Sequence, residues 1–237
     1  MRRPKFDFFV RKINLYQADA RVVAEHFAAW SNDFLSSVGG SSLRPVCQPA
    51  DQIIPMLEPF VSSMWTRKVI APIAGGWSAQ FDNNYRGTDS SGVSVLCQKV
   101  GCRALRVTAV EHTLKKVGER QWVGKYGAMI LQVFDAGVSR RTISAMNDGG
   151  RWDFYQSGEP FAFEDLRAYK NRRIRDRFTY EMMHRYLKEL GVQPFDLGSY
   201  TCSEDEPFYI IDRNKPLPGQ REVEYGGFRD EREFEDV

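Results

Sequence analysis

The sequence predicts an α+β fold, in which an antiparallel sheet of about five strands carries N-terminal and C-terminal helices packed mainly on one face. The first observation is a run of short β-prone segments between residues 103 and 156, joined by connectors of a few residues. Short connections favour antiparallel neighbours in a sheet. The second observation is that segments with helical spacing of apolar residues precede and follow this run, and such segments bury one face against a sheet.

Composition and length indicate one principal globular domain. Of the 237 residues, 42% are hydrophobic, 13% aromatic and 27% charged, which is ordinary for a folded chain. We expect a single domain over residues 1–216, with a helical N-terminal part at about 17–64 and a mixed sheet part at about 67–216. Residues 217–237 are polar and acidic, and we expect them to form a weakly ordered tail.

Charge is distributed unevenly along the chain. The formal net charge is +2, but from Ser203 onward eleven Asp or Glu residues stand against five Lys or Arg. The first 202 residues therefore carry a net charge of +8. Such a basic body attracts nucleic acid, anionic lipid or acidic protein, and an acidic tail that lies on the same surface competes with these partners.

The cysteine pattern predicts free thiols. The four cysteines include no C-x-x-C pair of the kind that zinc sites favour, and they are too sparse for a disulfide scaffold. The sequence shows no secretory leader and no apolar run long enough to span a bilayer. We expect a cytoplasmic protein with no metal, no cofactor and no membrane partner.

In the first third of the chain, the apolar pattern predicts two helices. Residues 17–36 have apolar side chains at helical spacing and are followed by a Gly-Gly pair, which ends an amphipathic helix. Residues 50–64 predict a shorter helix that its two prolines break, because each proline removes a backbone donor. A β-prone edge strand at 5–15 precedes these helices, and a linker rich in Ser, Gly and Pro at 39–49 separates them.

The middle of the chain predicts extended structure, a polar loop and a further helix. Residues 67–81 are β-prone with a break at their Gly-Gly pair. After the loop, residues 93–101 predict a helix, for which Thr88 or Asp89 is the expected N-cap.

The meander contains one strong hairpin signal, at residues 147–150. The sequence there is Asn-Asp-Gly-Gly, and these residues tolerate the positive φ angles of a tight turn. Pairing across the turn would place Met146 near Arg151. Further along, the apolar patch at 207–212 is expected to add an edge strand or to dock on the body.

The segment from Phe161 to Gly191 combines a helical pattern with the densest positive charge. Eight Lys or Arg lie between Glu164 and Leu190, against five Asp or Glu. The apolar stripe of the second half does not extend back through the first half. We therefore expect a short helix after Phe163, an arginine-rich joint, and a core-packing helix from about 179 to 190 that Thr179 caps.

The loop at 77–89 is the first candidate site. Its candidate binding residues are Trp77, Asp82, Asn83, Arg86 and Asp89. Recognition residues often lie on loops that a rigid scaffold holds, and an arginine beside polar groups suits a phosphorylated or carboxylated substrate. The same Asp and Asn residues also build turns and helix caps, and the glycine spacing and lysine of a phosphate loop are missing.

Arg141 and Trp152 are candidate binding residues on neighbouring strands. Strand alternation puts Arg141 on the side of Ile143 and leaves Arg140 in solvent, so we expect Arg141 to form a partly buried ion pair. A sheet face with arginines and aromatics can stack bases, although the strand motif of RNA-binding domains is absent.

The arginine-rich joint at 170–177 is the third candidate. Its candidate binding residues are Arg172, Arg173, Arg175 and Arg177. If they contact phosphates, the affinity will fall steeply with salt. If they are structural, they pair with carboxylates of the sheet or of the acidic tail. The near-neutral charge of the whole chain favours intramolecular or protein partners.

No catalytic arrangement stands out in the sequence. There are three histidines, no nucleophile elbow and no metalloprotease helix motif. We therefore expect a non-enzymatic, cytoplasmic protein-binding module that covers a toxin or an enzyme, as bacterial immunity proteins do. Two alternatives stay open. One is a nucleic-acid-binding protein that uses the joint at 170–177, and the other is an enzyme acting on a phosphorylated or carboxylated substrate at the loop at 77–89.

Overall fold

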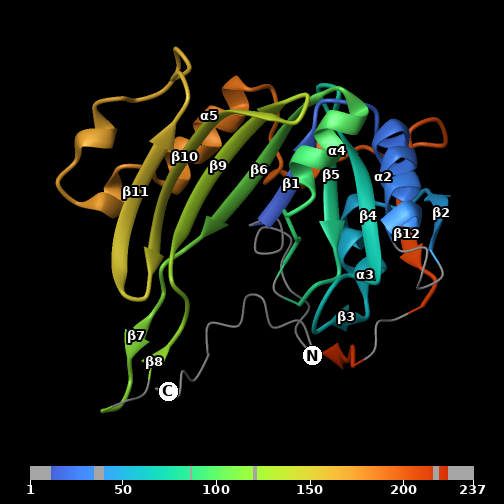
Figure 1. The fold of residues 1–237 in the computed structure, drawn as a ribbon, viewed down its shortest axis with the longest axis horizontal. Helices are drawn as coiled ribbons and strands as arrows, with labels where there is room; N and C mark the ends of the chain where they lie inside the picture. The colour runs from blue at the N-terminus through green and yellow to red at the C-terminus, as the bar shows by residue number, and fades with distance from the viewer. Residues whose placement is uncertain (1–11, 35–39, 86, 120–121, 216–218, 224–237) are drawn as a thin grey trace.

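One large antiparallel sheet organises the described part of the chain. The computed structural model describes residues 12–34, 40–85, 87–119, 122–215 and 219–223. The strands, in spatial order from edge to edge (Figure 1), are β11 (Arg151–Ser157), β10 (Val138–Asp148), β9 (Ala128–Asp135), β6 (Arg103–Val110), β1 (Lys12–Tyr16), β5 (Trp77–Asp82), β4 (Arg67–Ile73), β12 (Phe208–Arg213) and β2 (Ser41–Val46). The predicted α+β class with an antiparallel sheet is confirmed, but this sheet has nine strands instead of about five.

Three segments join the sheet in places that the sequence pattern did not predict. β1 pairs with both β5 and β6 in the middle of the sheet, so it is not an edge strand. β2 forms inside the expected linker and is itself an edge. β12 pairs on both sides, with β4 and β2. Periodicity within a segment indicates a strand, but the partner depends on side chains of the whole sheet.

Helices cover both faces of the sheet, whereas the prediction placed them mainly on one. α2 (Ala20–Phe34) and α4 (Val93–Val100) pack on one face, and α3 (Ile53–Leu57) and α5 (Tyr180–Glu189) contribute to the core on the other. Successive side chains of one strand point to opposite faces of the sheet and so contribute to both cores. Leu15 faces the α5 side, and the next residue, Tyr16, faces the α2 side.

The cover on the α2 side is incomplete. No described helix lies over β10 and β11 on this face (Figure 1). Towards the outer strands, α4 extends only as far as the turn between β9 and β10. A side chain added at Gly137 in this turn would meet Gln98 of α4. The outer strands therefore present side chains such as Tyr155, which is 56% exposed.

The β10–β11 hairpin confirms the predicted turn. Gly149 and Gly150 have φ angles of +60° and +91°, and Asp148 pairs with Arg151. The register differs from the expected pairing of Met146 with Arg151, because the turn has two residues at its tip. Met146 pairs with Asp153 instead.

Short elements complete the described chain. They are the 3-10 turns η2 (Ala50–Gln52), η3 (Ala168–Lys170), η4 (Ile174–Asp176) and η5 (Leu197–Ser199), and two small sheets that pair β3 (Phe60–Val61) with β13 (Glu222–Val223) and β7 (Lys115–Lys116) with β8 (Trp122–Val123). The helix predicted at 50–64 is broken as expected, since α3 ends before Pro59.

The segment from 161 to 190 follows the predicted division only in part. The short helix expected after Phe163 is replaced by the turns η3 and η4. The second helix is confirmed as α5, and the Thr179 hydroxyl accepts a hydrogen bond from the backbone N–H of Met182 at 3.4 Å.

Most of the predicted tail at 217–237 lies outside the described residues. Its described part includes β13, which pairs with β3. Among the helices that the structure describes, none combines the length and apolarity needed to cross a bilayer.

Candidate functional site

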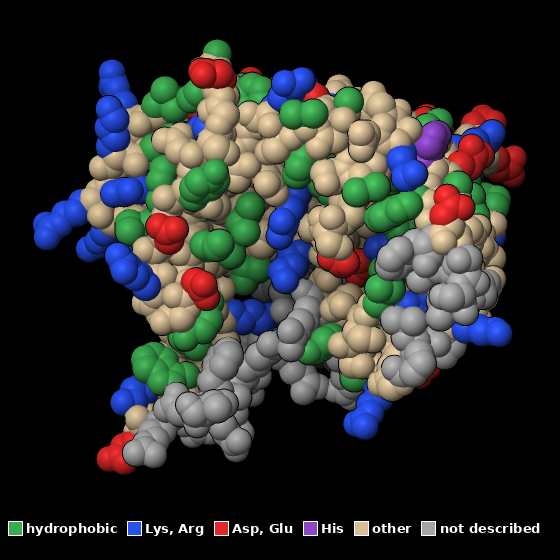
Figure 2. All heavy atoms as spheres, in the orientation of Figure 1, with side chains coloured by type: hydrophobic (Ala, Val, Ile, Leu, Met, Phe, Trp, Pro, Cys, Tyr) green, Lys and Arg blue, Asp and Glu red, His purple; other side chains and the backbone are tan. Residues whose placement is uncertain are grey.

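The cationic loop, which we define as residues 165–177, is the most strongly charged exposed segment next to β11. Lys and Arg side chains gather along this rim of the molecule in the space-filling view (Figure 2). The basic residues of the loop are Arg167, Lys170, Arg172, Arg173 and Arg175, which are exposed, and Arg177, which is half-buried.

Buried residues hold the cationic loop on the sheet. Glu164, immediately before the loop, is buried and accepts two hydrogen bonds from Arg141 on β10, at 2.9 and 2.6 Å. The Tyr169 hydroxyl, inside the loop, donates to the same carboxylate at 2.9 Å. Phe178, at the end of the loop, is fully buried in the core. The loop is thus fixed at its start, middle and end.

Arg141 forms the ion pair that the sequence predicted, with deeper burial than expected. Its side chain is 1% exposed. Besides Glu164, its guanidinium donates to the backbone carbonyls of Ser157 and Gly158 and to the Gln156 side chain. These bonds use all five guanidinium N–H groups, so no donor of Arg141 is left for a ligand.

The surroundings of Arg141 and Tyr169 keep both of these side chains protonated. Burial alone would lower the pKa of Arg141, but the hydrogen bond and charge of Glu164 raise it above its ordinary value. Burial and the hydrogen bonds with Tyr186 and Glu164 raise the pKa of Tyr169. Arg141 therefore stays charged and Tyr169 stays a donor, so the anchor is maintained across the physiological pH range.

The cations of the loop lack carboxylate partners within the described part of the chain, apart from one weak contact. Arg175 lies 3.8 Å from Asp176. Arg177 donates to the backbone carbonyl of Asn171 and lies over the Phe154 ring, with 5.7 Å between guanidinium carbon and ring centroid. The others form no ion pair with a described residue; they are Arg167, Lys170, Arg172 and Arg173.

Unlike the cationic loop, the loop at 77–89 has several of its predicted binding residues buried inside the protein. Trp77 is 2% exposed, so it is not a surface contact. Asp82 is fully buried, and its carboxylate accepts from the Lys68 ammonium at 2.9 Å and from the backbone N–H groups of Asn84 and Asp89.

Asn83 is also fully buried and ties this loop to β4. Its side-chain oxygen accepts from the backbone N–H groups of Thr66 and Arg67, and its nitrogen donates to the carbonyl of Pro59. Asp89 does not cap α4, whose N-cap position is Gly92. The carboxylate of Asp89 instead accepts from the backbone N–H and hydroxyl of Ser91. Arg86 lies outside the described residues.

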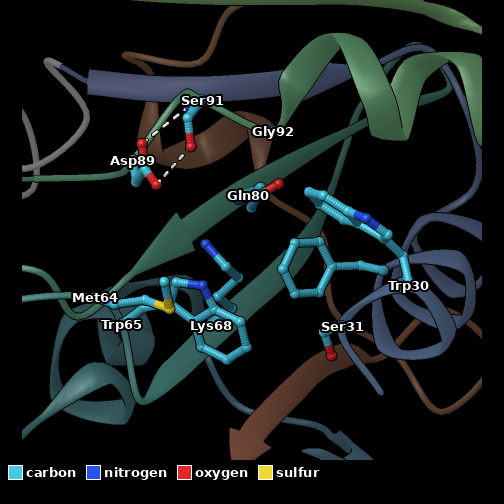
Figure 3. Close-up of a pocket in the computed structure, with 10 residues that line it drawn as sticks. Trp30, Ser31, Met64, Trp65, Lys68, Gln80, Asp89, Ser91 and Gly92 are labelled. Atoms are coloured by element: carbon cyan, nitrogen blue, oxygen red, sulfur yellow. Dashed lines mark hydrogen bonds between the residues drawn. The ribbon is translucent and has the colours of Figure 1, made fainter. Parts of the chain in front are cut away.

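A cavity of about 170 Å³ lies beside this loop, between α2 and the sheet (Figure 3). Its lining includes Phe27, Trp30, Trp65, Lys68, Gln80 and Asp89. The Lys68 side chain points into this space, with Trp65 on one side and Phe27, followed by Trp30, on the other. Of the described residues among those predicted for the loop at 77–89, Asp89 alone lines the cavity.

Trp152 lies apart from both places. It is half-buried on β11, and its ring lies 5.5 Å from that of His112. Among the described residues, no group of three or more His, Cys, Asp or Glu is arranged to hold a metal ion.

Sequence reasoning missed Lys68 and Glu164. Lys68 stands in an apolar strand and Glu164 in an aromatic segment, and a charged residue in such surroundings signals a buried ion pair. Comparison with protein-family models, with curated proteins and with solved structures finds no match for this chain.

Proposed function

We propose that this protein is a non-enzymatic binding module whose cationic loop docks on an acidic surface of a partner protein. The observation that carries the proposal is the set of loop cations without ion-pair partners among the described residues. Arginine and lysine side chains held this way contribute electrostatic complementarity and steer association with an acidic partner.

The anchoring of the loop supports a role in binding. Ordering a flexible loop costs free energy when a complex forms, and a loop that is already fixed avoids much of that cost. Glu164 provides this order through its bonds with Arg141, and Tyr169 provides it through its bond with Glu164. Arg141 therefore acts as a positioning residue, and the cations of the loop are the contact residues.

The exposed residues of the loop are of types that are common in protein–protein interfaces. Leu166, within the loop, is 48% exposed beside the arginines. Interfaces are enriched in arginine and aromatic residues that anchor the contact. Bacterial immunity proteins, which neutralise a toxin by binding it, have a function of this kind. The proposal of an immunity-type role for this protein is an analogy with that class.

Nucleic-acid binding is the second candidate, because phosphates would use the same unpaired guanidinium groups. Each phosphate contact would add to a steep salt dependence. The net charge of +2 for the whole chain gives weaker long-range attraction for a polyanion than a strongly basic protein has, and this favours the protein partner.

The experiment is affinity capture from cells that make the protein, with and without nuclease treatment. The wild-type chain is compared with Arg172→Ser/Arg173→Ser and with a control that replaces two exposed arginines elsewhere, Arg44→Ser/Arg140→Ser. We expect an acidic protein to be retained after nuclease treatment by the wild type and the control and to be lost from the loop variant. Loss of all partners on nuclease treatment would favour the second candidate.

A further inference from the structure

The cavity beside the loop at 77–89 contains a buried ammonium group whose hydrogen-bonding capacity is only partly used. Lys68 is 2% exposed. Its amino group donates to Asp82 Oδ2 at 2.9 Å and forms no other hydrogen bond with the described residues. An ammonium group has three donors, and a buried donor without an acceptor costs free energy. The cavity therefore offers donors to an incoming oxygen.

Aromatic rings stand on both sides of this ammonium group. It lies 4.8 Å from the centroid of the Trp65 ring and 5.1 Å from that of Phe27. Trp30 meets Phe27 edge to face, with ring centroids 5.5 Å apart. Cation–π attraction stabilises the ammonium group between these rings. The cavity thus combines flat apolar walls with one cationic donor.

The position of the Trp30 ring depends on a glycine. A Cβ atom placed on Gly92 would lie 2.6 Å from Trp30 Cη2, closer than any non-bonded carbon contact. Only glycine lets the ring lie against the backbone at the start of α4. This wall of the cavity is therefore formed by Trp30 of α2 packed against Gly92, the residue before α4.

The charge balance of the cavity favours a neutral ligand. Asp82 already neutralises Lys68 at 2.9 Å, and Asp89, an exposed residue, also contributes to the lining. An anionic ligand would bring a second negative charge to the single buried ammonium group, which Asp82 already neutralises. A carbonyl oxygen accepts from Lys68 without that repulsion.

Gln80 adds a second polar group to the lining. Its side-chain oxygen accepts a hydrogen bond from the Tyr16 hydroxyl at 2.9 Å. Burial raises the pKa of Tyr16 well above its ordinary value, so the hydroxyl stays protonated and keeps this orientation. The amide nitrogen of Gln80 forms no hydrogen bond with the described residues and is a further donor for a ligand oxygen.

We propose that this cavity binds a neutral, ring-sized aromatic carboxamide or lactam, with its carbonyl oxygen on the Lys68 ammonium and its ring against Trp30 and Trp65. A cavity of about 170 Å³ has the size of one that accommodates a single benzene ring, about 150 Å³ in an engineered case. The site does not depend on the cationic loop, because it lies between α2 and the sheet and the loop lies beyond β11.

The test is titration of the full chain with benzamide, followed by the indole N–H resonances of its tryptophans. Toluene, which lacks the oxygen, and benzoate, which adds a charge, are the matched probes. We expect benzamide to shift the resonances of Trp30 and Trp65 in a saturable manner, and we expect binding at least tenfold weaker for the other two. Equal binding of all three probes, or no shift with benzamide, would overturn the proposal.

Two variants separate the site from the rest of the fold. Trp30→Leu removes one wall without leaving a buried charge, and Trp122→Leu removes an exposed tryptophan in β8 as the matched control. We expect Trp30→Leu to weaken benzamide binding at least tenfold and Trp122→Leu to leave it unchanged. Lys68→Met/Asp82→Asn removes both charges together, and it should abolish the preference for benzamide over toluene. Retention of that preference would contradict the role of Lys68.

Discussion

The guanidinium of Arg141 and the carboxylate of Glu164 form a bidentate ion pair, with 2.9 Å between Nε and Oε1 and 2.6 Å between Nη2 and Oε2. Both side chains are buried, at 1% and 0% exposure. The pair joins β10 to the residue that precedes the cationic loop, so one contact connects the sheet with the proposed binding surface.

Replacing Arg141 by Met should strongly destabilise the protein. The substitution leaves the Glu164 carboxylate buried without its counter-ion, which typically costs about 3–5 kcal/mol. Chemical denaturation measures the change in the free energy of unfolding. Arg140→Met is the matched control, because Arg140 is 59% exposed and 3.7 Å from Asp135. It should cost less than about 0.5 kcal/mol, and an equal cost for both would contradict the assigned role of the pair.

Replacing Thr179 by Ala should lower stability by about 1 kcal/mol, since the first turn of α5 loses its N-cap. The hydroxyl is the group that accepts from Met182, so Thr179→Ser should retain most of the stability. The midpoint of urea unfolding compares the three chains. A serine variant as unstable as the alanine variant would show that the methyl group, and not the cap, matters.

Replacing Gly92 by Ala should displace the Trp30 ring, because the new methyl group would lie 2.6 Å from Trp30 Cη2. We expect a loss of about 1–3 kcal/mol, as for other overpacked sites. In a Trp30→Leu background the same alanine should cost much less, and this double-mutant cycle measures the coupling of the two positions. Additive effects would indicate that the ring is not the obstacle.

Burial raises the pKa of the Cys102 thiol from 9.0 to about 12. The thiolate is the reactive form, so alkylation of Cys102 in the folded chain should keep rising with pH between about 10 and 12, where alkylation in the urea-unfolded chain has levelled off. Peptide mass spectrometry follows the residue. Because the folded state holds this proton more tightly, the contribution to stability is complete below pH 9 and falls as the pH rises towards 12. A plateau near pH 10 in both states would contradict the shift.

Short-range sequence patterns predicted several of the local elements. The stripe of α2, the hairpin at Gly149 and Gly150, and the Thr179 cap all depend on short-range chemistry that a few neighbouring residues determine. The arrangement of the sheet depends on contacts between distant segments. β1 shows the difference, because nothing within its five residues indicates that β5 and β6 lie on either side.

For the candidate sites too, features that depend on neighbouring residues were predicted, and features that depend on distant segments were not. Alternation along β10 was enough to predict that Arg141 lies on the core side and Arg140 in solvent. Nothing local indicated that Trp77 and Asp82 are buried, because their cover comes from other parts of the fold. Lys68 and Trp30 come together only when α2 packs on β4, so the cavity has no signature within one segment.

The affinity of the loop variant for a captured partner tests the central claim most directly. Isothermal titration compares the wild-type chain, Arg172→Ser/Arg173→Ser and the control Arg44→Ser/Arg140→Ser, at constant salt. Guanidinium groups that form charge-assisted hydrogen bonds with an acidic surface should each contribute about 1.5 kcal/mol, so we expect the dissociation constant of the loop variant to rise at least tenfold and that of the control to stay unchanged. Equal affinity of all three chains would contradict the assignment of the cationic loop as the binding surface.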